Sequence, residues 1–176
     1  MPQEHSKERS APVASAASSD LSLLLRFIDE GFEKKAWHGP NLKGSIRGLS
    51  ASRVAWRPQS LKHSIAEIVV HCAYWKYAVR RRLTGEKRGS FALKGSNWFA
   101  IDAPLAEAQW KEYSGLLNRE HHALREVVGS FPPERLEEFP EGAKAPFVAQ
   151  IYGVAMHDVY HAGQIQLIKR LEGLPE

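Results

Sequence analysis

The helical character of this chain is clearest in Ser64-Ile65-Ala66-Glu67-Ile68-Val69-Val70-His71, which lies in a sequence of 176 residues. Its first four residues match a capping box, in which a serine hydroxyl and a glutamate carboxylate satisfy free amide groups at a helix start. Apolar residues then recur at spacings near 3.6 as far as Leu83, and Gly85 is typical of a helix end. The sequence therefore predicts a long helix from Ser64 to the turn before Gly85.

Three further helices are predicted from the same periodicity, over residues 21–37, about 102–128 and 147–173. A short helical turn at residues 49–53, which Ser50 could cap, interrupts the long connection 39–62. Another Gly- and Ser-containing connection runs over residues 86–103, and no segment has the pattern of a strand. The fold class predicted is all-α, a four-helix bundle with long crossover connections.

Composition is that of a globular protein, with 43% hydrophobic and 25% charged residues. Residues 1–19 lack apolar periodicity and are expected to form a disordered tail, which leaves residues 20–176 as one domain. No apolar stretch approaches the length of a membrane span, and no signal peptide is recognisable, so we expect a cytoplasmic protein without a membrane partner. A net charge of +4 is too small to indicate nucleic-acid binding, and the single cysteine excludes an internal disulfide.

Two histidines four residues apart, His157 and His161, fall on one face of the last predicted helix. Their neighbours are apolar or small, so the pair borders the buried side. His71 is set among apolar residues on another helix, and ligands from facing helices are how bundles build metal sites. Three neutral imidazoles suit zinc, nickel, iron(II) or copper, and three protein ligands leave one coordination position open. Burial of these histidines without a metal is the alternative.

At these residues the chain resembles the DinB-like (DinB and YfiT) superfamily of metal-binding four-helix bundles. The resemblance covers residues 21–171. It rests on Trp56-Arg57-Pro58, on the 64–71 stretch with Trp75, and on His157-Asp158-Val159-Tyr160-His161-Ala162-Gly163-Gln164-Ile165. It implies that His71, His157 and His161 are the metal triad.

The resemblance also implies an activity. Characterised members are similar to S-transferases and isomerases that use mycothiol, bacillithiol or glutathione, or to metal-dependent hydrolases. We therefore expect a metal-dependent enzyme that activates a low-molecular-weight thiol or water for attack on a small electrophile. The alternative is a non-catalytic metal-binding bundle of the stress response. Family members are often dimers, so a homodimer is also implied.

Other polar residues near the histidines are candidates for supporting roles. Gln164 shares the face of the histidine pair and could hydrogen-bond a ligand or a water, and Glu67 could act as a general base beyond its capping role. Asp158 is expected to face solvent or a neighbouring helix, and Cys72 to be a buried core residue. The pair His121 and His122 is expected at the surface. The basic residues of segment 76–88 are interpreted as a solvated helix end, with attraction of an anionic ligand as the alternative.

Overall fold

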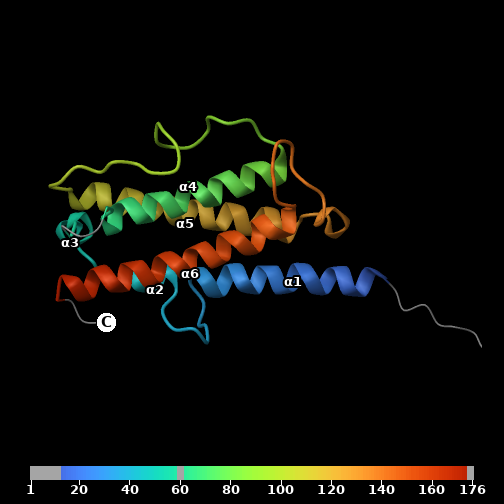
Figure 1. Cartoon of the computed structure of the whole chain (residues 1–176), viewed down its shortest axis with the longest axis horizontal. Coiled ribbons are helices and arrows are strands. Elements are labelled where there is room, and N and C mark those ends of the chain that lie inside the picture. The colour runs from blue at the N-terminus through green and yellow to red at the C-terminus, as the bar shows by residue number, and fades with distance from the viewer. Residues whose placement is uncertain (1–12, 59–61, 174–176) are drawn as a thin grey trace, which may run out of the picture.

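The computed structural model describes residues 13–58 and 62–173, and within these residues the chain is helical with no strand. The all-α prediction is therefore confirmed. Four long helices lie side by side (Figure 1): α1 (Val13–Phe32), α4 (Ile65–Thr84), α5 (Glu107–Gly129) and α6 (Phe147–Leu171). The connections carry α2 (Leu42–Ser45), α3 (Ala51–Ala55) and the 3-10 helix η1 (Pro133–Arg135). No helix in this described part combines the length and the apolarity needed to cross a membrane.

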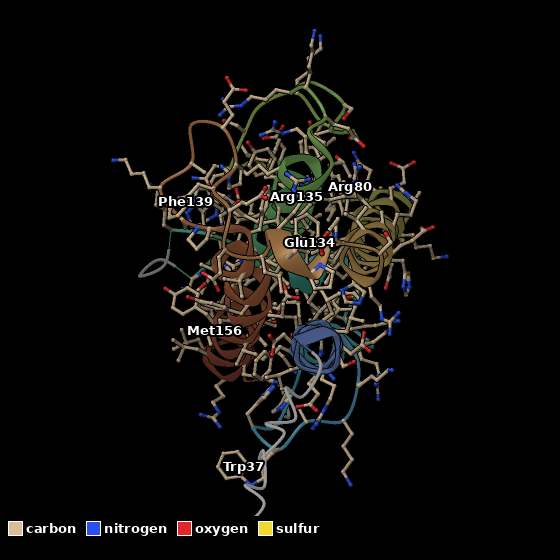
Figure 2. All side chains as sticks on the ribbon, turned by 90° about the vertical axis from the view of Figure 1, so that its right-hand side faces the viewer. Trp37, Arg80, Glu134, Arg135, Phe139 and Met156 are labelled. Atoms are coloured by element: carbon tan, nitrogen blue, oxygen red, sulfur yellow. The ribbon has the colours of Figure 1, made fainter. Side chains whose placement is uncertain are left out.

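Seen end-on, the four long helices surround a common interior, and η1 lies across the end that faces the viewer (Figure 2). Two groups of buried apolar side chains fill this interior, one towards the start of α4 and one towards its end. The outer face of α6 carries exposed apolar side chains such as Met156 and Tyr160, which are 61% and 62% exposed. A second copy of the chain would have an apolar surface to pack against there, and the homodimer stays a prediction.

The contacts between helices define their relative directions. The start of α4 packs with Leu117 of α5, and the end of α4 packs with Leu124 and Val128, so these two neighbours are parallel. A parallel pair needs a connection that returns along the bundle. Residues 85–106 make this return and run along the outside of α4 (Figure 1). By contrast, α6 is antiparallel to α4, because Arg82 contacts Gln150 while His71 contacts the later residue His157.

The start of α4 follows the prediction closely. The Ser64 hydroxyl accepts from the Glu67 amide at 3.3 Å, and the Glu67 carboxylate accepts from the Ser64 amide at 2.9 Å. At the other end, Gly85 has the left-handed conformation (φ 74°) that a residue without a Cβ adopts without strain. The short helix α3 is also present, with Ser50 at its N-cap position, although no hydrogen bond from the Ser50 side chain caps it.

The boundaries of α1 and α5 differ from the prediction. Helix α1 begins at Val13 rather than residue 21 and ends at Phe32 rather than residue 37. It ends early because the Asp29 carbonyl accepts hydrogen bonds from the amides of both Glu33 and Lys34. The remainder of the predicted tail, residues 1–12, lies outside the described residues. Helix α5 begins five residues later than predicted, since the Ile101 amide donates to Glu67 at 3.4 Å and holds this part of the connection against α4.

A buried ion pair joins α4 to α6. Lys76 and Asp158 have side chains only 1% exposed, and the Lys76 ammonium donates to the Asp158 carboxylate. One interpretation from sequence is corrected here, because Lys76 does not belong to a solvated basic surface. Of the two environments expected for Asp158, solvent or a neighbouring helix, the structure shows the neighbouring helix. The pairing explains why both charges are tolerated, because an unpaired charge at such a depth would be strongly destabilising.

The adjacent residues His121 and His122 differ in burial. His122 is exposed, as expected, but His121 is fully buried and stacks on Phe32 with ring centroids 3.8 Å apart. Neither ring nitrogen of His121 has a hydrogen-bond partner in the structure. Burial, followed by repulsion from Lys76, lowers the pKa of His121 to about 2. The expectation of a surface position was wrong because adjacent helical residues point about 100° apart.

This buried histidine should make the fold sensitive to acid. With a pKa lowered on folding, His121 contributes stability that is complete above pH 6.5 and is lost as the pH falls towards its folded pKa. At pH 5 the loss is about 2 kcal/mol relative to pH 8. The variant His121→Leu should therefore lose about 2 kcal/mol less than wild type between these pH values in urea unfolding. The exposed neighbour provides the control, and His122→Leu should follow wild type. Equal pH dependence in all three proteins would contradict the assignment.

Candidate metal centre

The Nε2 atoms of three imidazole rings, one from α4 and two from α6, lie close together. Nε2 of His157 lies 3.0 Å from Nε2 of His71 and 3.0 Å from Nε2 of His161. His71 and His161 are buried and His157 is partly buried. The ligand atoms of the three residues all lie within 4.8 Å of one another. The structure thus brings together the three histidines that the sequence singled out.

The outer nitrogens of two of these rings are held by oxygen acceptors. Nδ1 of His71 donates to the carbonyl oxygen of Asn97 at 2.8 Å, and Nδ1 of His161 donates to Oε1 of Gln164 at 2.7 Å. The Gln164 amide in turn donates to the Tyr160 hydroxyl at 2.9 Å, which orients the amide oxygen towards the ring. Since a neutral imidazole carries one proton, both Nε2 atoms present lone pairs to the centre.

These proton positions allow a test of whether the site fits a metal. His157 can donate at most one proton, so only one of its two 3.0 Å contacts can be a hydrogen bond between neutral rings. The lone pair of the other ring would then have no proton to accept, whereas a cation at the centre would accept a lone pair from each of the three Nε2 atoms. Zinc–nitrogen bonds of about 2.0–2.1 Å at tetrahedral angles separate ligand nitrogens by about 3.3 Å, close to the observed spacing. The donor set and the spacing fit a divalent metal.

The electrostatics of the site favour the neutral, ligating form of the rings. Burial is the first cause in each case, and repulsion between the histidines adds to it for His157 and His161. The pKa of His157 is lowered to about 3 and that of His161 to about 4, and the pKa of His71 is lowered as well. At neutral pH none of the three rings is an imidazolium, so no ring has to lose a positive charge before it binds a metal.

Sequence reasoning missed three residues that surround the triad. Trp98 stacks on His71 with centroids 3.8 Å apart, and His63 stacks on the other face of Trp98 at 3.5 Å. Asn97 holds His71 through its backbone and accepts from the Trp75 indole through its side chain at 3.0 Å. Asn97 has φ 64°, a left-handed conformation that asparagine adopts more readily than most residues.

The remaining candidates do not belong to the group of ligand atoms that the three histidines form. The Glu67 carboxylate is engaged by Arg57 at 2.6 Å, by the Ser64 amide and by the Ile101 amide, which accounts for its burial. Its role as a general base stays a prediction, as does a catalytic role for Gln164. Cys72 is fully buried as expected, and burial raises the pKa of its thiol. A buried thiol of that kind is a poor nucleophile and a poor metal ligand.

Two cavities approach the site. A groove of about 250 Å³ runs between α4 and α6 and is lined at one end by His157. A larger cavity of about 690 Å³ lies between α4 and residues 88–97, with Trp75 and Asn97 in its wall. Part of the predicted basic stretch lines this larger cavity, namely Arg81, Arg82 and Arg88. The anionic-ligand interpretation of these three residues is therefore compatible with the structure.

Comparison with known proteins gives one family. The sequence profile of the DinB superfamily matches residues 37–165, a range that contains all three histidines. No curated protein and no solved structure matches the chain significantly.

The hydrogen bond from His161 to Gln164 should contribute to metal affinity. Removing an acceptor of this kind typically weakens metal binding about 10- to 100-fold, because the ring loses its fixed tautomer and orientation. We expect Gln164→Ala to show this loss in a zinc titration by calorimetry. Gln166 lies two positions further on, about 200° round the helix, and Gln166→Ala is the matched control. Equal zinc affinity for Gln164→Ala and wild type would show that the hydrogen bond does not tune the site.

Proposed function

Because this chain belongs to the DinB superfamily, we propose that His71, His157 and His161 hold a divalent metal and that the site is catalytic. Zinc, nickel and iron(II) all accept imidazole ligands, and the ligand set does not discriminate among them. The observation that carries the proposal is the convergence of three Nε2 atoms, two of them with lone pairs fixed inwards. Among residues 13–58 and 62–173 no fourth side chain joins this group of ligand atoms.

An incomplete protein ligand set is typical of catalytic sites, whereas structural sites are closed by four protein ligands. The carboxylate of Glu67, one turn before His71 on α4, is engaged by Arg57 and by two backbone amides, so it is not free to close the site as a fourth ligand. When bound, a divalent metal would lower the pKa of a coordinated thiol or water and polarise an electrophile. The protein would supply orientation, through Asn97 and Gln164, and shielding from water, through Trp98.

Transfer of a low-molecular-weight thiol to a small electrophile is the reaction that the cavities favour. Such a reaction needs room for two organic reactants, while a hydrolase needs room for one. The groove at His157 and the larger cavity share Trp75 and Arg82 in their walls, so two molecules could approach the site from two sides. Arg81, Arg88 and Lys94 of the larger cavity suit a thiol that carries carboxylates.

The proposal is tested with untagged protein loaded with zinc, nickel or iron(II). Glutathione, bacillithiol and mycothiol are each offered together with a chromogenic haloarene such as 1-chloro-2,4-dinitrobenzene. We expect one thiol at least to react faster than without enzyme. The variant His71→Ala should lose the metal and the rate enhancement together, because two imidazoles rarely retain a divalent ion.

His38 is exposed in the loop after α1 and belongs to no group of ligand atoms, so His38→Ala is the control and should behave as wild type. A His71→Ala protein that lacks metal yet keeps the full rate would contradict the proposal. If no thiol reacts while chelation lowers the melting temperature, the metal instead has the structural role of a non-catalytic bundle.

A further inference from the structure

The groove between α4 and α6 has the composition of a binding site for an amphiphilic molecule. Its walls are largely apolar, with Trp75 and Val79 from α4 and Val154 from α6. His157 lies at one end, so a molecule in the groove reaches the metal centre. Arg82 is the one cation among the lining residues. The groove therefore combines an apolar length with a single charged end.

Gly153 lines this groove and contributes no side chain to it. It lies inside α6, where glycine is less favourable than alanine because it loses more conformational entropy. A Cβ built at Gly153 would meet nothing within 4 Å, so neither packing nor backbone conformation requires glycine there. Gly163 of the same helix is equally unobstructed but does not line the groove. Of these two glycines, only Gly153 lies where the absence of a side chain leaves space for a ligand.

Arg82 has a neutral hydrogen-bond partner instead of a carboxylate. Its Nη1 donates to the neutral Oε1 of Gln150 at 3.1 Å, and no carboxylate in the described part of the chain lies within ion-pair distance. The preceding Arg80, by contrast, pairs with Glu86 and Glu120. Burial and the neighbouring charges of Arg81 and Arg88 lower the pKa of Arg82. A bound anion would relieve this repulsion and would be attracted by all three guanidinium groups.

The two ends of the groove set the length of its occupant. Gln150, the partner of Arg82, and His157 are seven residues apart on α6, which corresponds to about 10 Å along the helix. We propose that the groove binds the electrophilic substrate, an organic anion with an extended apolar chain, with its anionic group at Arg82 and its reacting end at His157. The assignment of the reacting end rests on the proposed function, whereas the binding of such an anion does not.

Octane-1-sulfonate is a suitable probe, because its extended chain is of similar length and a sulfonate is a weak metal ligand. Binding to the full-length, zinc-loaded protein is measured by calorimetry and by quenching of tryptophan fluorescence. We expect octanesulfonate to bind at least tenfold more tightly than 1-octanol, which lacks the charge, and than ethanesulfonate, which lacks the chain. Arg82→Gln should abolish the preference over octanol, and Arg80→Gln should retain it.

Glycine variants test the apolar part of the groove. Gly153→Leu should reduce octanesulfonate binding at least tenfold, since the leucine side chain would occupy the groove, while Gly163→Leu should bind as wild type. Should Gly153→Leu fail to fold, Gly153→Ala is used, which should melt at a higher temperature than wild type and bind the probe more weakly. Equal binding of octanol and octanesulfonate, or wild-type binding by Arg82→Gln or by the folded Gly153 variant, would overturn the proposal.

The two proposals fail in different ways. A protein that binds octanesulfonate as described but takes up no metal would contradict the proposed function and leave the groove assignment standing. An active metalloenzyme that does not bind octanesulfonate would overturn the groove assignment alone.

Discussion

The fixed orientation of two imidazole rings is the constraint on which the site depends. His71 and His161 each give their Nδ1 proton to a held oxygen, of Asn97 and of Gln164, so their Nε2 lone pairs must face His157. Burial keeps the rings neutral, and the single proton of His157 can satisfy at most one of these two lone pairs, whereas a cation between the rings would satisfy both. This arrangement of polar groups therefore lowers the stability of the fold without a metal, and a bound metal would offset that loss.

The topology of the chain supplies this arrangement. Because α4 and α5 are parallel, residues 85–106 have to return along the outside of α4, and this return brings Asn97 and Trp98 against His71. The antiparallel packing of α6 on α4 brings the histidine pair from the other side, and the buried pair of Lys76 and Asp158 lies next to it. A specific ion pair at this depth favours one register of the two helices, since a shift along the axis would leave both charges unpaired.

Local signals in the sequence were sufficient to predict the four long helices and to place the histidine pair on one face of the last of them. The capping box at Ser64, the glycine at position 85 and the spacing of His157 and His161 each depend on neighbours in the chain, and each is found as expected. The burial of His121 and the pairing of Lys76 with Asp158 depend on which helix packs opposite, and periodicity does not contain that information. Asn97 and Trp98 belong to an irregular connection, whose path is determined by the parallel arrangement of α4 and α5 rather than by its own composition.

X-ray absorption spectroscopy on untagged protein, loaded with stoichiometric zinc and free of added thiol, would identify the ligands of the metal directly. We expect three imidazole nitrogens at about 2.0–2.1 Å, with the remaining scattering from oxygen of solvent. His161→Ala should reduce the imidazole contribution by one ring if metal is retained at all. A spectrum with sulfur in the first coordination sphere would place the metal at Cys72, and a spectrum with a single imidazole would place it elsewhere. Either result would contradict the three-histidine site.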